Sequence, residues 1–262
     1  MNFQPVIPIG GLPGWTFLNA TLGNQKSAFD QSTRVTRDTE YFEQTVTAGT
    51  TAEDLVNDRR LRRVALGAFG LLDDIDNRAF IRKILDDGST ADDALANRLT
   101  DDRYRQLAEA FGYGDFLGSR TGDPGFGAEI TAKFRARQFE IAVGEQDQGL
   151  RIALNAERVL PDLIKDGSEN TKWLRIMGDP PLREMFETAL GLPTGFGQID
   201  LDRQVEEFGD RASRQLGIDA LSDLAEPDVM ENLIQRFLLR QQIGDFTVQL
   251  SGSIALTLLQ AG

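Results

Sequence analysis

The sequence predicts an all-α fold, a multi-helix bundle of two halves in which one capped helix recurs. Apolar residues recur every three or four positions through most of the chain, which is the period of an amphipathic helix. Many of these segments begin at aspartate or threonine and end at glycine, the residue types that cap helices. Only residues 246–258 alternate as a strand does, and they also fit the i, i+4 spacing of a helix. Because residues 6–9 are the one candidate strand partner, we predict a helix over residues 246–258 too.

The first part of the chain is expected to hold an extended segment and then short helices. Three prolines lie within residues 1–15, so this segment is predicted to be extended and the first helix to begin near Thr16. Thr50 and Glu53 have the spacing of a capping box at a helix start. Further helices are predicted over 34–46, 59–69, 77–85, 91–99 and 101–111.

Residues 112–127 carry the strongest loop signal, with six glycines and one proline. We place the boundary between the two halves in this loop. The predicted organisation is an extended segment over 1–15, a helical half over 16–117 and a second over 118–262, which can pack as one domain. The second half is predicted to hold helices over 128–165 (one, or two in line), 180–190, 201–216 and 228–243.

One helix with a glycine end recurs in both halves. Aligning residues 58–71 with 179–192 gives six identities in fourteen positions, without a gap. Asp58 and Asp179 are predicted N-caps, and Gly70 and Gly191 are predicted to take the left-handed conformation that ends a helix. The recurrence reflects either duplication of an ancestral half or the repeated use of the same helix-ending residues.

Charge and composition disfavour several classes of function. The net charge is −13, which repels nucleic-acid phosphates and anionic lipid, so neither is an expected partner. No run of 18 apolar residues is present, and hence no insertion into a membrane is expected. The N-terminus lacks the basic and apolar regions of a secretion signal. The expected location is the cytoplasm, or the outside after export without a cleaved signal.

The chain also lacks the residues on which most catalytic sites depend. It has no cysteine and no histidine, which removes thiolate chemistry, the commonest general base and the commonest metal ligand. Acidic clusters such as 73–76 and 86–88 lack the calcium-loop pattern and are read as caps and turns. We therefore predict no catalytic residue, no metal site and no cofactor.

Five residues are candidates for contact with a partner. Four arginines, Arg59, Arg60, Arg62 and Arg63, lie close together on an otherwise acidic chain. They fit a surface for an acidic partner or a set of salt bridges between the halves. The alternative is a solvated face whose long side chains cover the edge of the core. Trp15 follows the Pro/Gly-rich segment and is a second candidate contact, with a place in the core as the alternative.

Several motifs together resemble an uncharacterised domain-of-unknown-function family met mainly in alphaproteobacteria. The match covers nearly the whole chain and includes Gly14-Trp15-Thr16-Phe17-Leu18, Tyr41-Phe42, Asp54-Leu55, Arg59-Arg60-Leu61, Ala68-Phe69-Gly70-Leu71, Phe80-Ile81, Ala96-Asn97-Arg98-Leu99 and Gly178-Asp179-Pro180-Pro181-Leu182-Arg183. Members of that family are often encoded near flagellar genes. The resemblance therefore implies a flagellum-associated protein, and it implies no catalytic residue.

Two functions of different classes follow from the sequence. The first is a non-enzymatic structural or protein-interaction protein, associated through the resemblance with flagellar assembly or function and binding flagellar proteins. The alternative is a protein that binds a small molecule or a divalent cation, or an enzyme that works with carboxylates and no histidine. The partner and the oligomeric state are left open.

Overall fold

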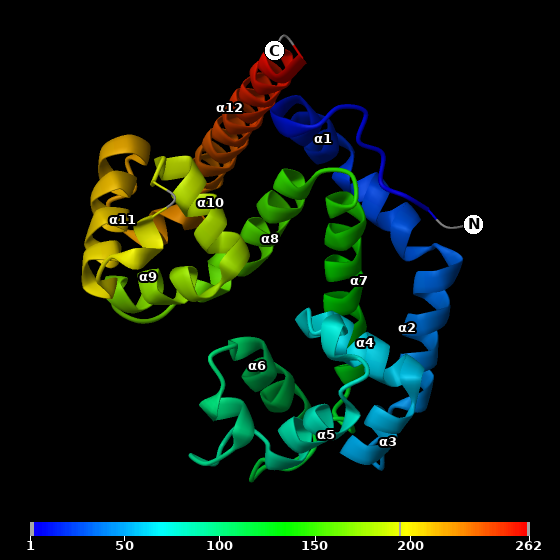
Figure 1. Ribbon diagram of the computed structural model, residues 1–262. Helices are drawn as coiled ribbons and strands as arrows, with labels where there is room; N and C mark the ends of the chain where they lie inside the picture. Colours follow the sequence, from blue (N-terminus) through cyan, green and yellow to red (C-terminus); the bar gives the residue numbers. More distant parts are fainter. Residues whose placement is uncertain (1–2, 194, 261–262) are drawn as a thin grey trace. The chain divides into compact units, whose positions relative to one another are not determined.

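The computed structural model describes residues 3–193 and 195–260, with the backbone alone for 245–260. This part of the chain contains helices and no strand, so the predicted all-α class is confirmed (Figure 1). The α-helices are α1 (Gly11–Asp30), α2 (Thr33–Thr45), α3 (Ala52–Asn57), α4 (Arg59–Phe69), α5 (Arg78–Asp87), α6 (Asp102–Phe111), α7 (Phe126–Gly144), α8 (Gln148–Leu163), α9 (Glu169–Gly178), α10 (Pro180–Leu190), α11 (Leu201–Leu216) and α12 (Pro227–Gln260).

The chain forms two compact units. Unit one comprises residues 1–6 and 21–142, and unit two comprises residues 7–20 and 143–262. The chain passes from one unit to the other within α1 and again at the end of α7. The predicted boundary, residues 112–127, instead lies inside unit one. Glycine and proline in a sequence mark turns of the backbone. The chain passes between these units in long helices, and a helix gives no glycine or proline signal at the point of passage.

Unit one is built around α4, which contacts α2, α3 and α6. Its buried face includes Leu61, Val64 and Leu66, and only three of its eleven positions are left for the outside or the half-buried edge. These side chains join one apolar cluster with Phe42 of α2 and Phe111 of α6. Burial of such a continuous face supplies most of the stability that a helix this short lacks by itself.

Unit two is built in the same way around α10, which contacts α8, α9, α11 and α12. Leu182, Met185 and Phe186 are fully buried on this helix. They pack in a unit whose other core residues include Phe237 and Leu238 of α12. The central helix of each unit is thus one copy of the element that recurs in the sequence.

The caps predicted for the two copies are confirmed. Asp58 and Asp179 each end the preceding helix and cap the next one, accepting hydrogen bonds from its first N–H groups. Gly70 and Gly191 have φ values of 74° and 63°. In both copies the glycine N–H bonds to the carbonyl three residues back, and the N–H of the next leucine bonds to the carbonyl five residues back. This pair of bonds is the Schellman motif.

Three boundaries differ from the prediction. Helix α1 begins at Gly11 rather than near Thr16. Pro13 lies in its first turn, where backbone N–H groups have no partner within the helix, so a proline without an N–H is tolerated. The capping box is formed by Thr51 and Asp54, one residue later than predicted. The helix predicted over 91–99 is reduced to a single 3₁₀ turn at Leu95–Arg98.

The C-terminal segment continues α12 as a helix to Gln260, as predicted. Its side chains beyond residue 244 lie outside the described residues, as do residues 261 and 262. The segment predicted over 128–165 forms two helices, α7 and α8, and Pro161 is accommodated within α8.

Candidate functional site

The four clustered arginines are mostly engaged within unit one. Arg63 forms an ion pair of 2.6 Å with Asp38, and Arg60 lies 3.8 Å from the same carboxylate. The Arg60 guanidinium also lies over the ring of Tyr41, 4.4 Å from its centroid. Of these four side chains, only that of Arg59 is exposed. The cluster therefore ties α4 to α2 and presents little surface to a partner.

Two of the predicted contacts are corrected by their burial. Arg62 is 1% exposed, and its Nη1 donates to the carbonyl of Val56. Trp15 is completely buried, and its indole N–H donates to the carboxylate of Glu231 at 3.0 Å. Both side chains therefore belong to the interior, because the faces of α4 and α1 that carry them pack against the rest of their own units.

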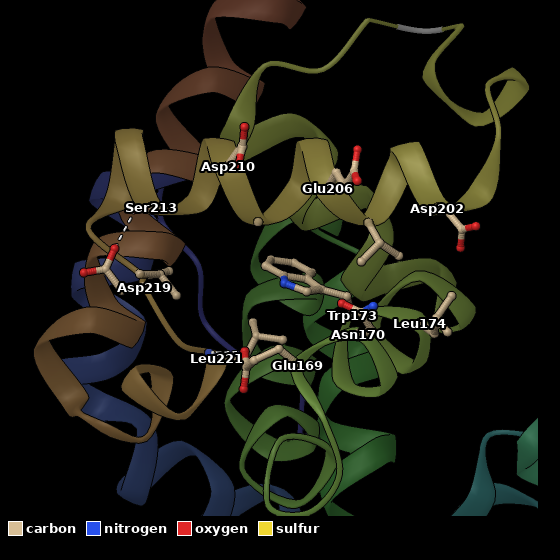
Figure 2. A pocket seen from close by; sticks show the side chains of 13 residues that line it. Glu169, Asn170, Trp173, Leu174, Asp202, Glu206, Asp210, Ser213, Asp219 and Leu221 are labelled. Carbon is tan, nitrogen blue, oxygen red and sulfur yellow. Dashed lines mark hydrogen bonds between the residues drawn. The ribbon is translucent and has the colours of Figure 1, made fainter.

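A groove of about 710 Å³ lies between α9 and α11 in unit two (Figure 2). Five carboxylates line it, from Glu169, Asp202, Glu206, Asp210 and Asp219, and the lining contains no lysine or arginine. We call this feature the acidic groove. Its volume is within the range of ligand sites, and its charge favours a cationic ligand.

Three of the carboxylates form a stripe on α11. Asp202, Glu206 and Asp210 are four residues apart, and a rise of 1.5 Å per residue separates neighbours by roughly 6 Å along the helix axis. All three are exposed. Asp210 has a distant ion pair with Arg214, at 3.8 Å and with both side chains largely in solvent. Such a pair contributes little, so the stripe keeps most of its negative field.

The remaining two carboxylates are held in place by hydrogen bonds. Glu169 accepts from the N–H of Leu221 at 2.8 Å and from Lys172 at 2.8 Å. Burial acts to raise the pKa of Glu169, but these two bonds outweigh it and the pKa is lowered. Ser213 donates to Asp219 at 2.6 Å, as Figure 2 shows. Glu169 is therefore ionised at neutral pH.

Trp173 lies against the inner side of the groove. Its ring stacks on Phe208 with centroids 5.5 Å apart and meets Phe186 edge-on at 5.2 Å. The side chain is only 5% exposed, yet its ring lines the groove beneath α11 (Figure 2). A Cβ at Gly209 would lie 3.6 Å from the indole nitrogen, at van der Waals contact, so this edge of the ring faces α11 closely. Among the described residues the indole N–H has no hydrogen-bond partner.

The geometry of the groove suits binding better than covalent chemistry. Within the described part of the chain, no group of three acidic side chains is arranged to hold a metal ion. The stripe carboxylates are exposed to solvent rather than enclosed by the groove. The arrangement offers distributed negative charge and one fixed hydrogen-bond donor.

Unit one carries a second surface feature, an apolar pair at the tip of a turn. Phe116 and Leu117 are 96% and 95% exposed. The turn is held by Asp115, whose carboxylate accepts from the backbone N–H groups of Ser89 and Thr90 at 2.6 and 3.0 Å. Because this carboxylate anchors the turn, the two apolar side chains are presented on an ordered base. We call this feature the apolar turn.

Neither feature was among the residues singled out in the sequence. The stripe was readable as acids at positions i, i+4 and i+8 of a predicted helix. The apolar turn was readable as two large apolar residues inside a glycine-rich loop. Trp173 gave no such signal, since a buried tryptophan and one that lines a groove look the same in a sequence.

These features describe an all-helical protein with two cores, each formed around a capped central helix, and with surfaces suited to binding. The chain belongs to a family described as "Protein of unknown function (DUF1217)", whose model matches residues 68–230. It is also similar to the crystal structure of protein AGR_C_984 from Agrobacterium tumefaciens, with 24% identity and a TM-score of 0.73 over 92% of this chain and 99% of that one. At this identity the likeness shows the fold alone. A search of curated proteins gives no match. Within the described residues, no helix is long and apolar enough to span a bilayer.

Proposed function

We propose that this protein is a non-enzymatic structural or assembly protein that binds other proteins. The observation that carries the proposal is the apolar turn, in which Phe116 and Leu117 are almost fully exposed on an anchored base. Exposed apolar surface is unfavourable in water and marks contact sites when it is held in a fixed position. Large apolar and aromatic side chains also dominate the binding energy of protein interfaces.

The base of the turn supports the same reading. Gly112 and Gly118 have φ values of 65° and 78°, a conformation that side chains other than glycine rarely adopt. A Cβ at Gly114 would lie 2.3 Å from the carbonyl of Asp86. The local sequence thus favours one conformation of the turn, which lowers the entropy lost on binding.

The flagellar association remains part of this proposal. It is supported by the resemblance of the sequence motifs to a family often encoded near flagellar genes. In that setting the protein acts in the cytoplasm, or outside after export without a cleaved signal. Deletion of the gene should then impair swimming or the number of flagella, and normal motility with normal flagella would remove this part of the proposal.

The apolar turn gives a direct test of protein binding. A photo-crosslinking amino acid placed at Phe116 in living cells should give discrete adducts with another protein, whereas the same group at exposed Asp93 should not. The double variant Phe116→Ser, Leu117→Ser should stay folded by circular dichroism and reproduce the deletion phenotype. Equal adducts at both positions, or a double variant that behaves like wild type, would contradict the proposal.

The second candidate is a protein that binds a small cation, and the acidic groove is the observation that favours it. Its volume of about 710 Å³ and its five carboxylates suit a small organic cation such as a polyamine. A thermal-shift series with calcium, magnesium and spermine tests it. An increase in melting temperature with one of these ligands, lost on neutralising the stripe, would support it.

A further inference from the structure

We propose that the acidic groove binds an extended, basic segment of a partner protein, with arginine or lysine at alternate positions. One main-chain carbonyl of that segment accepts a hydrogen bond from the indole N–H of Trp173. The inference rests on the proposed function, since it names the chemistry of a protein partner. It concerns a different surface from the apolar turn, so each can fail without the other.

The charge of the groove favours a segment with several positive charges. The lining has five carboxylates and no basic side chain. Among the described residues, the stripe has one ion pair, that of Asp210 with Arg214 at 3.8 Å in solvent. Three adjacent acids on one helix repel one another. A ligand with several positive charges relieves this repulsion and gains from every carboxylate.

The spacing of the stripe matches that of side chains on one face of an extended chain. Neighbouring acids of the stripe are roughly 6 Å apart along α11. In an extended chain, side chains on one face are two residues apart, or about 6.6 Å. A segment with a basic residue at every second position can therefore place its charges opposite Asp202, Glu206 and Asp210 in turn.

Trp173 decides between an extended peptide and other cationic ligands. Its indole N–H can only donate a hydrogen bond. The Trp173 side chain is 5% exposed, and it lines the groove. Ammonium and guanidinium groups are donors too, so a polyamine would leave this N–H unpaired. The carbonyl groups of a helix are already bonded within the helix. An extended segment has free carbonyl groups along its whole length, whereas a helix has them only in its last turn, so the extended segment can supply the charges and the acceptor together.

The test uses the whole protein and a hexapeptide of alternating arginine and serine, blocked at both ends. Binding is measured by calorimetry at low and at high salt. In parallel, the two tryptophan indole N–H signals are followed by nuclear magnetic resonance. We expect salt-sensitive binding and a shift of the Trp173 signal, whereas the Trp15 signal, already bonded to Glu231, stays in place. Spermine should bind more weakly and leave the Trp173 signal unchanged.

Two variants and a matched control separate the contributions. The triple variant Asp202→Asn, Glu206→Gln, Asp210→Asn should weaken peptide binding about tenfold. The control Asp73→Asn, Asp92→Asn, Asp93→Asn makes the same charge change at exposed sites in unit one and should leave affinity within about twofold. Trp173→Phe keeps an aromatic ring and removes the donor, so it should weaken peptide binding about fivefold and leave spermine binding unaltered.

Several results would overturn the inference. Absence of peptide binding at low salt would do so, even if crosslinks at Phe116 still supported the proposed function. Equal losses in the triple variant and its control would show a response to net charge alone. Spermine binding as tightly as the peptide, with the same shift of the Trp173 signal, would identify a small-cation site instead. If Trp173→Phe loses its helical signal, the indole shift in the unmodified protein still decides the question.

Discussion

The hydroxyl of Tyr41 donates a hydrogen bond of 2.6 Å to Oδ2 of Asp58, whose Oδ1 accepts from the N–H groups of Arg60 and Leu61. One carboxylate thus caps α4 and ties it to α2. Burial acts to raise the pKa of Asp58, but the bonds from Tyr41 and from the helix N–H groups outweigh it, and the pKa lies below its usual range. The ionised form is therefore favoured by folding.

Replacing Asp58 with alanine should destabilise the protein by about 1–2 kcal/mol at neutral pH, because the helix loses its N-cap and Tyr41 its partner. A group with a lowered pKa stabilises the fold above its unfolded pKa of about 3.9 and loses that effect as pH falls through the folded value. The difference from wild type, measured by urea unfolding, should shrink below about pH 4. An equal difference at neutral and acidic pH would contradict this role.

Two glycine-to-alanine substitutions should have opposite signs. Gly70 has a φ of 74°, so Gly70→Ala should destabilise unit one by about 1–2 kcal/mol through the strain of a left-handed side chain. Gly23 lies within α1 with open space at its Cβ position. Gly23→Ala should stabilise by about 0.5–1 kcal/mol, since alanine favours helix. Thermal unfolding of both variants tests the assignment, and the same sign in each would contradict it.

All three tyrosines should ionise at higher pH in the folded protein than in the unfolded chain. Burial, followed by the hydrogen bond to Asp74, raises the pKa of Tyr104 to about 12. The hydrogen bond to Asp58 raises the pKa of Tyr41, and burial raises that of Tyr113. Tyrosinate absorbance should rise at higher pH in the folded protein than in concentrated urea, where the full step lies near pH 10.

The same shifts set the stability of the protein in alkali. A raised pKa stabilises the fold fully below the unfolded value of about 10, and this effect is lost as pH rises through the folded value. Stability should therefore fall between pH 10 and about 12, where Tyr104 ionises. In Tyr104→Phe the absorbance component near pH 12 should disappear. A full tyrosinate step at the same pH in the folded and in the unfolded protein would contradict this assignment.

Arg62 should be replaceable by an apolar residue without loss of stability. Its side chain is 1% exposed, and its Nε and Nη2 are buried without a hydrogen-bond partner in the described structure. Burial, and then the nearby charge of Arg78, lowers the pKa of Arg62, as expected for a cation poorly compensated in the interior. Arg62→Met should leave the free energy of unfolding unchanged or raise it by up to about 2 kcal/mol. A loss of similar size, measured by urea unfolding, would show that the guanidinium is well satisfied.

The sequence signal was strongest where the physical requirement is local. Helix ends must satisfy their N–H and carbonyl groups with nearby residues, and the caps at Asp58, Gly70, Asp179 and Gly191 were therefore readable. It was weaker at the start of α1, where a proline in the first turn resembles a proline outside a helix. It also missed α9, whose short apolar pattern does not stand out from its surroundings.

By itself the sequence determined the all-helical class, the two capped helices that recur, and the lack of histidine and cysteine chemistry. Tertiary structure alone decided which charges and rings are buried. Arg62 and Trp15 lie in the interior, although charge and position had suggested contact with a partner. Glu169 of α9 and the acidic stripe of α11 meet in one groove although some thirty residues or more separate them in the chain. Helical periodicity depends on neighbours within two turns, whereas a groove depends on how separate helices pack, and no local pattern encodes that.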